Sequence, residues 1–408
     1  GSSSILQPDP PHFPQISTLS ALAETCVALR ALGHRVVIVS SGAVGMGLHR
    51  MELPAVQTGK KRAIGEKQAL AAIGQGRLIA LWDQIFGALK QPIAQILMTR
   101  NDIADRSRYL NATTTLSTLL SLGVIPIINE NDTISVSEIL HINKFGDNDT
   151  LSAIAAGMCG ADYLFLMTDV DGLYEDNPRR VPGARRVSKV RDIEEVRKLV
   201  STSTLGSSLG TGGMETKLIA AELATAAGCA TVITLGSMPT RILTIVQNHS
   251  ARTVPSSPML GATASLPTTN EAAPVAHPPY TLFTPKISPL SSRRFWILHG
   301  LTPRGTVFVD EGAYRALTRG ERDGGGSGNG GRLLAAGVIR VEGAFAAGQA
   351  VRVCVIEFGR GLSNYNSVEI DRVKGHRSSD IEKIIGYVEA EHVVESIVEL
   401  RAATGKGR

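Results

Sequence analysis

The sequence has few aromatic residues, and its cysteines are far apart. Aromatic residues make up 4% of the 408 residues, and only four are cysteines. No two cysteines have the C-x-x-C spacing of a zinc or redox site, and a chain of this length needs no disulfide framework. These features argue against a small disulfide-stabilised scaffold and predict a core built from aliphatic side chains.

Long apolar runs and a strong net charge are also missing. No run reaches the roughly 18 apolar residues of a membrane span, and the N-terminus lacks the pattern of a signal peptide. The 42 Lys+Arg against 37 Asp+Glu give a net charge of +5, which permits an anionic ligand but does not require nucleic acid. We therefore expect a soluble, cytoplasmic protein with no membrane partner.

The first part of the chain alternates between helical patterns and short apolar strands. Helices are expected at 16–32, 61–89, 109–122, 150–158 and 214–227. Strands are expected at 36–39, 93–98, 124–128, 163–167 and 231–235. Because these strands are apolar throughout, the pattern predicts an α/β fold with a mainly parallel sheet sandwiched by helices. Ligands in such folds bind beyond the carboxyl ends of the strands.

The composition changes after this region. Residues 249–279 are rich in Pro, Ser, Thr and Ala and hold only two charged residues, which predicts a disordered insertion. Short strands expected at 294–298, 306–309, 337–341 and 351–356 indicate a second, smaller β-rich domain, and 389–403 has the pattern of a terminal helix. We therefore divide the chain into a domain at 1–287, a β-rich domain at 288–390, and a C-terminal tail or helix at 391–408.

Five polar or glycine-rich motifs follow the predicted strands or begin the predicted helices. They are Ser40–Gly47, Asn129–Asp132, Lys144–Thr150, Thr168–Tyr174 and Gly210–Lys217. Glycines at a strand end let backbone N–H groups approach an anion, and a lysine at a helix start suits a polyphosphate. Each motif alone has an ordinary explanation, as a turn, a helix cap or a surface loop.

The recurrence of these motifs favours a shared functional site. The last motif is not a Walker A loop, because Leu218 follows its lysine. The nine histidines are dispersed, so a hydrolase acting through Ser41 would lack an identifiable base. Together the motifs predict phosphoryl transfer from a nucleotide, on a fold other than the P-loop type.

The ordered set SSGAVGMGL, NENDT, KFGDNDTLSA, MTDVDGLY and GTGGMETK resembles the glutamate 5-kinases of the amino acid kinase superfamily. The resemblance covers residues 1–248, and 281–283 resemble the last strand of the family's kinase domain. Residues 290–387 resemble the PUA domain that many members carry. The resemblance implies ATP-dependent phosphorylation of the L-glutamate γ-carboxylate to γ-glutamyl phosphate, the first step of proline synthesis.

The resemblance also implies a role for individual residues. Ser41, Asp132 and Asn148 would contact glutamate, and Asp147 would receive its ammonium group. Asp149 would orient the catalytic lysines.

Other residues would bind ATP. Thr168 and Asp169 would contact the nucleotide, and Lys217 would offset charge on the transferring phosphoryl group. The nucleotide loop would consist of Gly210, Thr211, Gly212, Gly213 and Met214. The phosphate-binding turns would consist of Gly1, Ser2, Gly42 and Ala43. Mg2+ would be carried mainly by ATP, so the resemblance names no protein ligand for it.

The N-terminus departs from the family pattern. Members carry a first strand that ends in a lysine just before the Gly-Ser turn, and here Gly1 and Ser2 match that turn without the strand. Loss of one phosphate-binding cation costs on the order of 2.7–4 kcal/mol of transition-state stabilisation, by analogy with an electrostatic donor. We therefore expect impaired turnover from the chain.

Other functions compete with this hypothesis. Acetylglutamate or aspartate kinase activity is one alternative, and a degenerate kinase that acts as a regulator is another. An RNA-binding protein is a third, but 290–408 hold 17 Lys+Arg against 14 Asp+Glu, which is no concentrated basic face. We therefore do not expect RNA binding. Family traits further imply a homo-oligomer and feedback inhibition by proline.

Overall fold

The structure, a computed structural model, describes residues 5–7, 13–54, 62–134, 148–178, 180–181, 183–200, 213–253, 278–286, 289–301, 303–322, 332–355 and 357–399. The chain divides into two compact units. The first comprises Gly1–Thr99 and Ala112–Lys286, and the second comprises Arg100–Asn111 and Ile287–Arg408. The expected domain boundaries remain predictions, although the second unit takes in residues 100–111, which the sequence placed in the first domain.

The second unit takes in this segment because side chains tie it there. The indole Nε1 of Trp296 donates a hydrogen bond to the carbonyl oxygen of Ile103 at 2.9 Å. The guanidinium of Arg106 lies 4.9 Å from the centre of the Trp296 ring, within the range of a cation–π contact.

In the first unit, strands alternate with helices. The helices are α2 (Ile16–Ala31), α3 (Ala43–Arg50), α4 (Ile64–Ala88), α6 (Arg106–Ser121, which begins in the second unit), α7 (Asn148–Cys159), α8 (Ile193–Leu199), α9 (Met214–Ala226) and α10 (Arg241–Thr253). Its strands are β1 (Ile38–Val39), β2 (Ile93–Met98), β3 (Ile125–Glu130), β4 (Tyr163–Thr168), β5 (Leu173–Tyr174), β6 (Arg186–Val187), β7 (Lys189–Val190), β8 (Ala230–Leu235) and β9 (Thr281–Phe283). The alternation confirms the predicted α/β class.

The strands form a mainly parallel framework. One sheet has the order β1-β3-β2, and both of its pairs are parallel. A second sheet has the order β4-β8-β9-β7, in which only the β8–β9 pair is antiparallel. Strand β1 is shorter than the predicted 36–39, because it pairs with β3 only through Ile38 and Val39. Strands β5 and β6 form a separate antiparallel pair.

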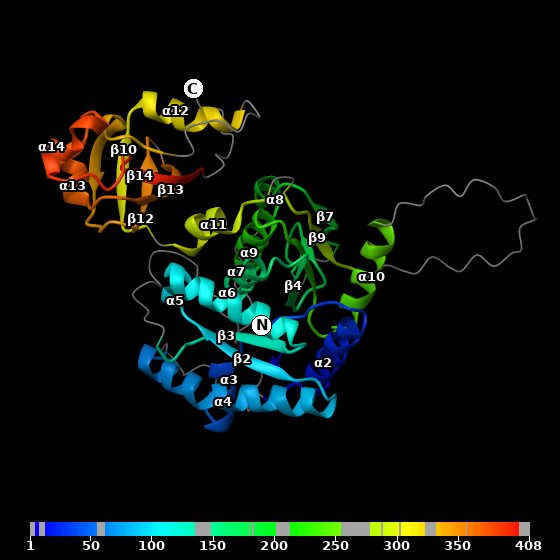
Figure 1. The fold of residues 1–408 in the computed structure, drawn as a ribbon. Coiled ribbons are helices and arrows are strands. Elements are labelled where there is room, and N and C mark those ends of the chain that lie inside the picture. The colour runs from blue at the N-terminus through cyan, green and yellow to red at the C-terminus, as the bar shows by residue number, and fades with distance from the viewer. Residues whose placement is uncertain are drawn as a thin grey trace, which may run out of the picture. The chain divides into compact units, whose positions relative to one another are not determined.

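Helices cover both sheets on either face. Figure 1 shows α3 and α4 on one side of the first sheet and α6 on the other. The second sheet packs its buried Leu166, Ile233 and Phe283 against alanines and leucines of α7 and α9. Side chains of α10 pack with α2 and with Phe165 and Met167 of β4. This layering confirms a sheet sandwiched by helices.

The second unit is richer in strands. Its sheet has the order β11-β10-β12-β13-β14. The strands are β10 (Gly305–Val309), β11 (Val338–Glu342), β12 (Ala350–Cys354), β13 (Glu357–Ser363) and β14 (Val394–Glu399). The helices are α5 (Arg100–Ala104), α11 (Ser292–Phe295), the π-helix η2 (Trp296–Gly300), α12 (Glu311–Arg322), the 3-10 helices η3 (Ala335–Gly337) and η4 (Ser378–Asp380), α13 (Ser367–Val373) and α14 (Ile381–Ile385).

Two sequence predictions for this unit are wrong. The expected strand at 294–298 is helical, in α11 and η2, because a short run of buried apolar residues fits either structure. The expected terminal helix is instead β14, which pairs with β13 and buries Val394 and Ile397. The β-branched residues of this segment favour a strand.

The predicted insertion at 249–279 overlaps α10, which extends to Thr253. Residues 254–277 lie outside the described residues.

The cysteines are buried or partly buried thiols. All four are free, and burial raises the pKa of Cys26 and of Cys229 to about 12. A thiol with so high a pKa is unreactive at neutral pH. In the described part of the chain, no helix has the length and apolar character needed to cross a membrane.

Candidate active site

A tight turn follows β1. The backbone N–H of Ser40 donates to the carbonyl oxygen of Ile128 at 2.9 Å, which extends the pairing with β3 by one residue. Gly42 has φ +115°, a conformation that side chains with a Cβ rarely adopt, and it forms the N-cap of α3. The turn therefore aims Ser41 and the start of α3 beyond the carboxyl edge of the sheet, where backbone N–H groups can meet an anion.

A second polar segment begins with the last residues of β3, which runs two residues beyond the predicted strand at 124–128. Asn129 is 2% exposed, and its Nδ2 donates to the Oε1 of Gln75 at 2.8 Å. Three residues further on, burial raises the pKa of Asp132 to about 6, and the nearby carboxylate of Glu130 adds to this rise. A carboxylate that has lost hydration in this way gains from an incoming cationic group such as an ammonium.

Helix α7 begins with two polar side chains at the same edge. Asn148 and Asp149 form its first turn, and the Ser152 hydroxyl donates to the carbonyl oxygen of Asp149 at 2.6 Å. The Oδ1 of Asn148 is buried and has no hydrogen-bond partner within the described residues. A buried acceptor left unsatisfied is costly, so this oxygen suits a donor supplied by a ligand.

A buried ion pair joins α7 to α9. The Nζ of Lys217 lies 2.9 Å from the Oδ2 of Asp149, and the two side chains are only 11% and 17% exposed. The Thr216 hydroxyl lies 3.0 Å from the same carboxylate oxygen and 2.7 Å from the carbonyl oxygen of Gly213. Removal of either side chain would leave the charge of the other without a partner in a poorly hydrated place, which is costly. The ion pair therefore holds both side chains in their observed positions.

Strand β4 adds a fourth group of polar residues. The hydroxyl of Thr168, at the end of the strand, donates to the Oδ1 of Asp169 at 3.1 Å. The phenol of Tyr174 donates to the Oδ1 of Asp171 at 2.6 Å, and this hydrogen bond raises the pKa of Tyr174.

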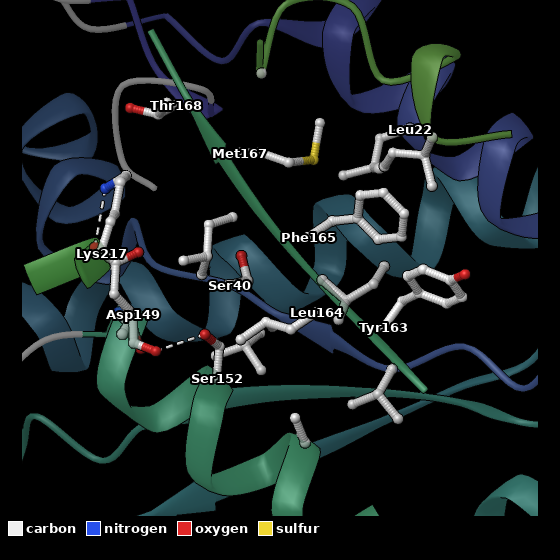
Figure 2. A pocket seen from close by; sticks show the side chains of 18 of the residues that line it. Leu22, Ser40, Asp149, Ser152, Tyr163, Leu164, Phe165, Met167, Thr168 and Lys217 are labelled. Atoms are coloured by element: carbon white, nitrogen blue, oxygen red, sulfur yellow. Dashed lines mark hydrogen bonds and ion pairs between the residues drawn. The ribbon is translucent and has the colours of Figure 1, made fainter. Parts of the chain in front are cut away.

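Several of these groups, among them Ser41, Asp149 and Lys217, line one cavity of about 710 Å³, within the range of about 300–1,000 Å³ typical of ligand pockets. Figure 2 shows Lys217 facing Asp149 on one side of β4, with the apolar Leu22 and Phe165 on the other. The cavity therefore has a polar end, where an anion and a cation could both be held, and an apolar end.

The structure places many of the predicted site residues in this cavity. They are Ser41, Asn148, Asp149, Thr168, Asp169, Gly213, Met214 and Lys217. Asp132, Gly42 and Ala43 are described but are not part of its lining. The remaining predicted residues lie outside the described residues. They are Gly1, Ser2, Asp147, Gly210, Thr211 and Gly212.

Some polar residues of the site were not predicted. Thr216 immediately precedes Lys217 in the first turn of α9, so its motif held a signal for it. Trp82 and Gln75 lie on α4, far in the sequence from the residues that they contact, and no local pattern marks them.

Comparisons with known proteins show which families the chain resembles. Residues 1–234 match the Amino acid kinase family, and residues 326–385 match the PUA domain. The probable glutamate 5-kinase of Schizosaccharomyces pombe is 50% identical over 396 residues, which cover 96% of this chain and 90% of that protein. The glutamate 5-kinase of Rippkaea orientalis is 46% identical, over 97% of this chain and 95% of that protein.

Among solved structures, an isopentenyl phosphate kinase aligns with a TM-score of 0.38 at 14% sequence identity. The alignment covers 59% of this chain and 90% of that one, a likeness too low to support an inference.

Proposed function

The chain belongs to the amino acid kinase family and, within it, to the glutamate 5-kinases, and from this premise we propose the chemistry of its cavity. The protein transfers the γ-phosphoryl group of ATP to the γ-carboxylate of L-glutamate and so forms γ-glutamyl phosphate, the first intermediate of proline biosynthesis. The observation that supports this best is the buried Lys217–Asp149 pair, which lies in the same cavity as Ser41 and Asn148.

The reaction requires positioned charge rather than a covalent nucleophile of the protein. An oxygen of the glutamate γ-carboxylate attacks the γ-phosphorus, and the bond from phosphorus to the bridging oxygen breaks, so that ADP leaves with the electron pair. The attacking carboxylate is already ionised at neutral pH, so no general base is needed. Catalysis therefore depends on alignment of the two substrates and on stabilisation of the negative charge of the phosphoryl group.

Lys217 supplies that stabilisation. Its ammonium pairs with Asp149 in the described structure, and a phosphoryl group that enters the cavity offers it a second anionic partner. Asp149 keeps the ammonium in place by the ion pair, so the lysine is oriented before ATP arrives. Thr168, Asp169, Gly213 and Met214 line the same cavity and hold the nucleotide.

Glutamate binds at the ends of β1 and β3 and at the start of α7. Ser41 and Asn148 contact its carboxylate and polar groups. The resemblance gives Asp132 a contact with glutamate and Asp147 the ammonium, and we propose that Asp132 shares that ammonium. The raised pKa of Asp132 agrees with this role, because a poorly hydrated carboxylate gains most from a cation. Asp147 is proposed to assist with the ammonium.

Mg2+ accompanies ATP in this proposal. Mg2+ in nucleotide sites is usually bound through substrate phosphates and one or two carboxylates, so we propose that phosphate oxygens of ATP provide most of its ligands. The ion neutralises phosphate charge when it is bound. Loss of activity in a chelator, and its recovery on addition of Mg2+, would test this.

The proposal extends to regulation and assembly. We propose feedback inhibition by proline, a homo-oligomeric state, a cytoplasmic location and no RNA binding for the strand-rich second unit. Each rests on the family resemblance or on the charge balance of the sequence.

An acyl-phosphate assay tests the function directly. The protein is incubated with ATP, Mg2+ and hydroxylamine, which converts an acyl phosphate into a stable hydroxamate. We expect a hydroxamate from L-glutamate in preference to N-acetylglutamate or aspartate. A preference for either of the other two substrates would refute the proposed function.

A further inference from the structure

Helix α4 touches the candidate glutamate site with two long side chains from a single face. Gln75 and Trp82 are seven residues apart, which places them two turns apart on the same side of a helix. The Oε1 of Gln75 accepts a hydrogen bond from Asn129 at 2.8 Å, at the end of β3. The Nε1 of Trp82 donates to the hydroxyl oxygen of Ser40 at 3.3 Å, just after β1. One helix thus contacts the carboxyl ends of two neighbouring strands.

The two contacted residues are themselves neighbours. Strands β1 and β3 run parallel, with Val39 opposite Ile128, and the next residue along each strand is Ser40 or Asn129. Both side chains are almost completely buried, at 1% and 2% exposed. A hydrogen bond in such a place strongly restricts orientation, because its loss leaves a polar atom without water.

Each contact continues toward a residue that we assign to glutamate. The hydroxyl of Ser40 lies 3.1 Å from the carbonyl oxygen of Ser41 and donates to it, so the Trp82 indole acts on the turn through Ser40. Asn129 begins the segment that ends in Asp132. In these hydrogen bonds the side chains of α4 contact neither Ser41 nor Asp132, although Trp82 also lines the cavity.

Close packing fixes α4 relative to the same turn. A Cβ on Gly74 would lie 1.9 Å from the carbonyl oxygen of Ala43, and a Cβ on Gly47 would lie 2.0 Å from that of Leu70. These distances mean that the backbones of α3 and α4 are in direct contact. Helix α3 starts directly after Gly42, so the turn is held by backbone packing on one side and by the Trp82 indole on the other.

We propose that Gln75 and Trp82 are positioning residues for the glutamate site, which they set by fixing the ends of β3 and β1. This assignment rests on the proposed function. It predicts that loss of either hydrogen bond weakens glutamate binding and leaves ATP binding largely unchanged. The residues assigned to ATP lie on other elements: Thr168 ends β4, Gly213 directly precedes α9, and Lys217 is in α9.

Titration calorimetry of the full chain, with L-glutamate and with ATP in separate experiments, tests the proposal without a need for turnover. Trp82→Phe keeps a buried aromatic ring but removes the N–H donor, and Gln75→Leu removes the acceptor. We expect each to raise the Kd for glutamate about threefold to tenfold, the effect of one lost hydrogen bond, while the Kd for ATP changes less than twofold.

Matched variants on the same helix separate positioning from loss of stability. Gln84→Leu makes the same change at an exposed position, and Phe86→Leu trims a fully buried neighbour of Trp82 that contributes only packing. Both should leave the two Kd values within twofold of the unaltered protein, even where Phe86→Leu lowers the Tm.

A double-mutant cycle tests the route through Ser40. Ser40→Ala should weaken glutamate binding as Trp82→Phe does, and the two together should do no more than one alone. Ser40→Thr, which keeps the hydroxyl, should restore most of the affinity.

Three results would overturn the assignment. They are equal weakening of both ligands, unchanged glutamate affinity in both α4 variants, and additive effects of the Ser40 and Trp82 changes. Experiments on the unaltered protein distinguish failure of the positioning role from failure of the proposed function. If it forms the glutamate hydroxamate while the variants bind normally, only the positioning role fails. If it does not bind glutamate, the proposed function fails and the positioning role with it.

Discussion

Asp132 provides a prediction that links stability to substrate binding. Its pKa is raised from an ordinary 3.8 to about 6, chiefly by burial and further by the carboxylate of Glu130. The folded protein therefore binds a proton at this carboxyl more readily than the unfolded chain does. We predict that Asp132→Asn, which removes the charge and keeps the shape, stabilises the fold and weakens glutamate binding.

The magnitude follows from the two pKa values. Each pKa unit corresponds to about 1.4 kcal/mol, so keeping Asp132 ionised in the folded protein costs up to about 3 kcal/mol above pH 6. This cost is fully present above the folded pKa, falls as the pH drops through about 6, and is gone below the unfolded pKa of 3.8. The gain from Asp132→Asn should therefore be largest above pH 7 and vanish near pH 4.

Urea denaturation at pH 4, 5, 6 and 7.5 measures this gain as a difference in the free energy of unfolding between the variant and the unaltered protein. Asp83→Asn, at an exposed position on α4, is the matched control and should change stability little at any pH. An Asp132→Asn variant that is less stable than the unaltered protein at pH 7.5 would refute the reasoning.

Glutamate binding should show the opposite dependence. If ionised Asp132 holds the ammonium, its ionised fraction falls from about nine-tenths at pH 7 to about one-tenth at pH 5, and the affinity for glutamate falls about tenfold. Calorimetry at the two pH values measures this change, and Asp132→Asn should bind weakly and equally at both. A glutamate affinity that does not change between pH 7 and pH 5 would contradict the role of Asp132.

Three further predictions concern other parts of the molecule. Lys217→Met should lower kcat by about 10²–10³, the effect of losing one electrostatic donor, and an ADP-release assay that shows unchanged kcat would contradict its role. Gly74→Ala places a Cβ 1.9 Å from a backbone oxygen and should cost about 1–3 kcal/mol in urea denaturation, whereas Gly76→Ala, where no atom lies within 4 Å, should be neutral or stabilising. Tyr365→Phe removes a buried hydroxyl that accepts two backbone N–H groups and donates to the Ala390 carbonyl, so the variant should unfold about 1–3 kcal/mol more easily, and equal stability would argue against these bonds.

Much of the fold was predictable from local patterns. The predicted strand at 93–98 matches β2, and the predicted helix at 16–32 differs from α2 by one residue. The strand is a short apolar run bounded by Pro92 and Thr99, and the helix ends just before Gly33. The error at 294–298 arose because five residues are too few to distinguish a buried strand from a buried helix. The strand β14 was missed because its partner, β13, lies more than thirty residues earlier in the chain.

The site residues could be predicted from the sequence only where they belong to a short, recognisable motif. Asp149 and Lys217 stand in such motifs, and the fold brings them within 2.9 Å although 68 residues separate them. Trp82 gave no such signal, because a tryptophan in an apolar helix face is typical of a core residue. Its hydrogen bond to Ser40 depends on how α4 packs on the turn after β1, which no local pattern contains.

The central claim is that the cavity phosphorylates the side-chain carboxylate of glutamate, and the hydroxamate assay with purified protein tests it most directly. With ATP and Mg2+ present, L-glutamate should give a hydroxamate and a matching amount of ADP, and Lys217→Met should give little of either. The outcome is decided by which of the three substrates reacts fastest, and not by the absolute rate with any one of them. A hydroxamate that forms faster from aspartate or N-acetylglutamate than from L-glutamate would contradict the account.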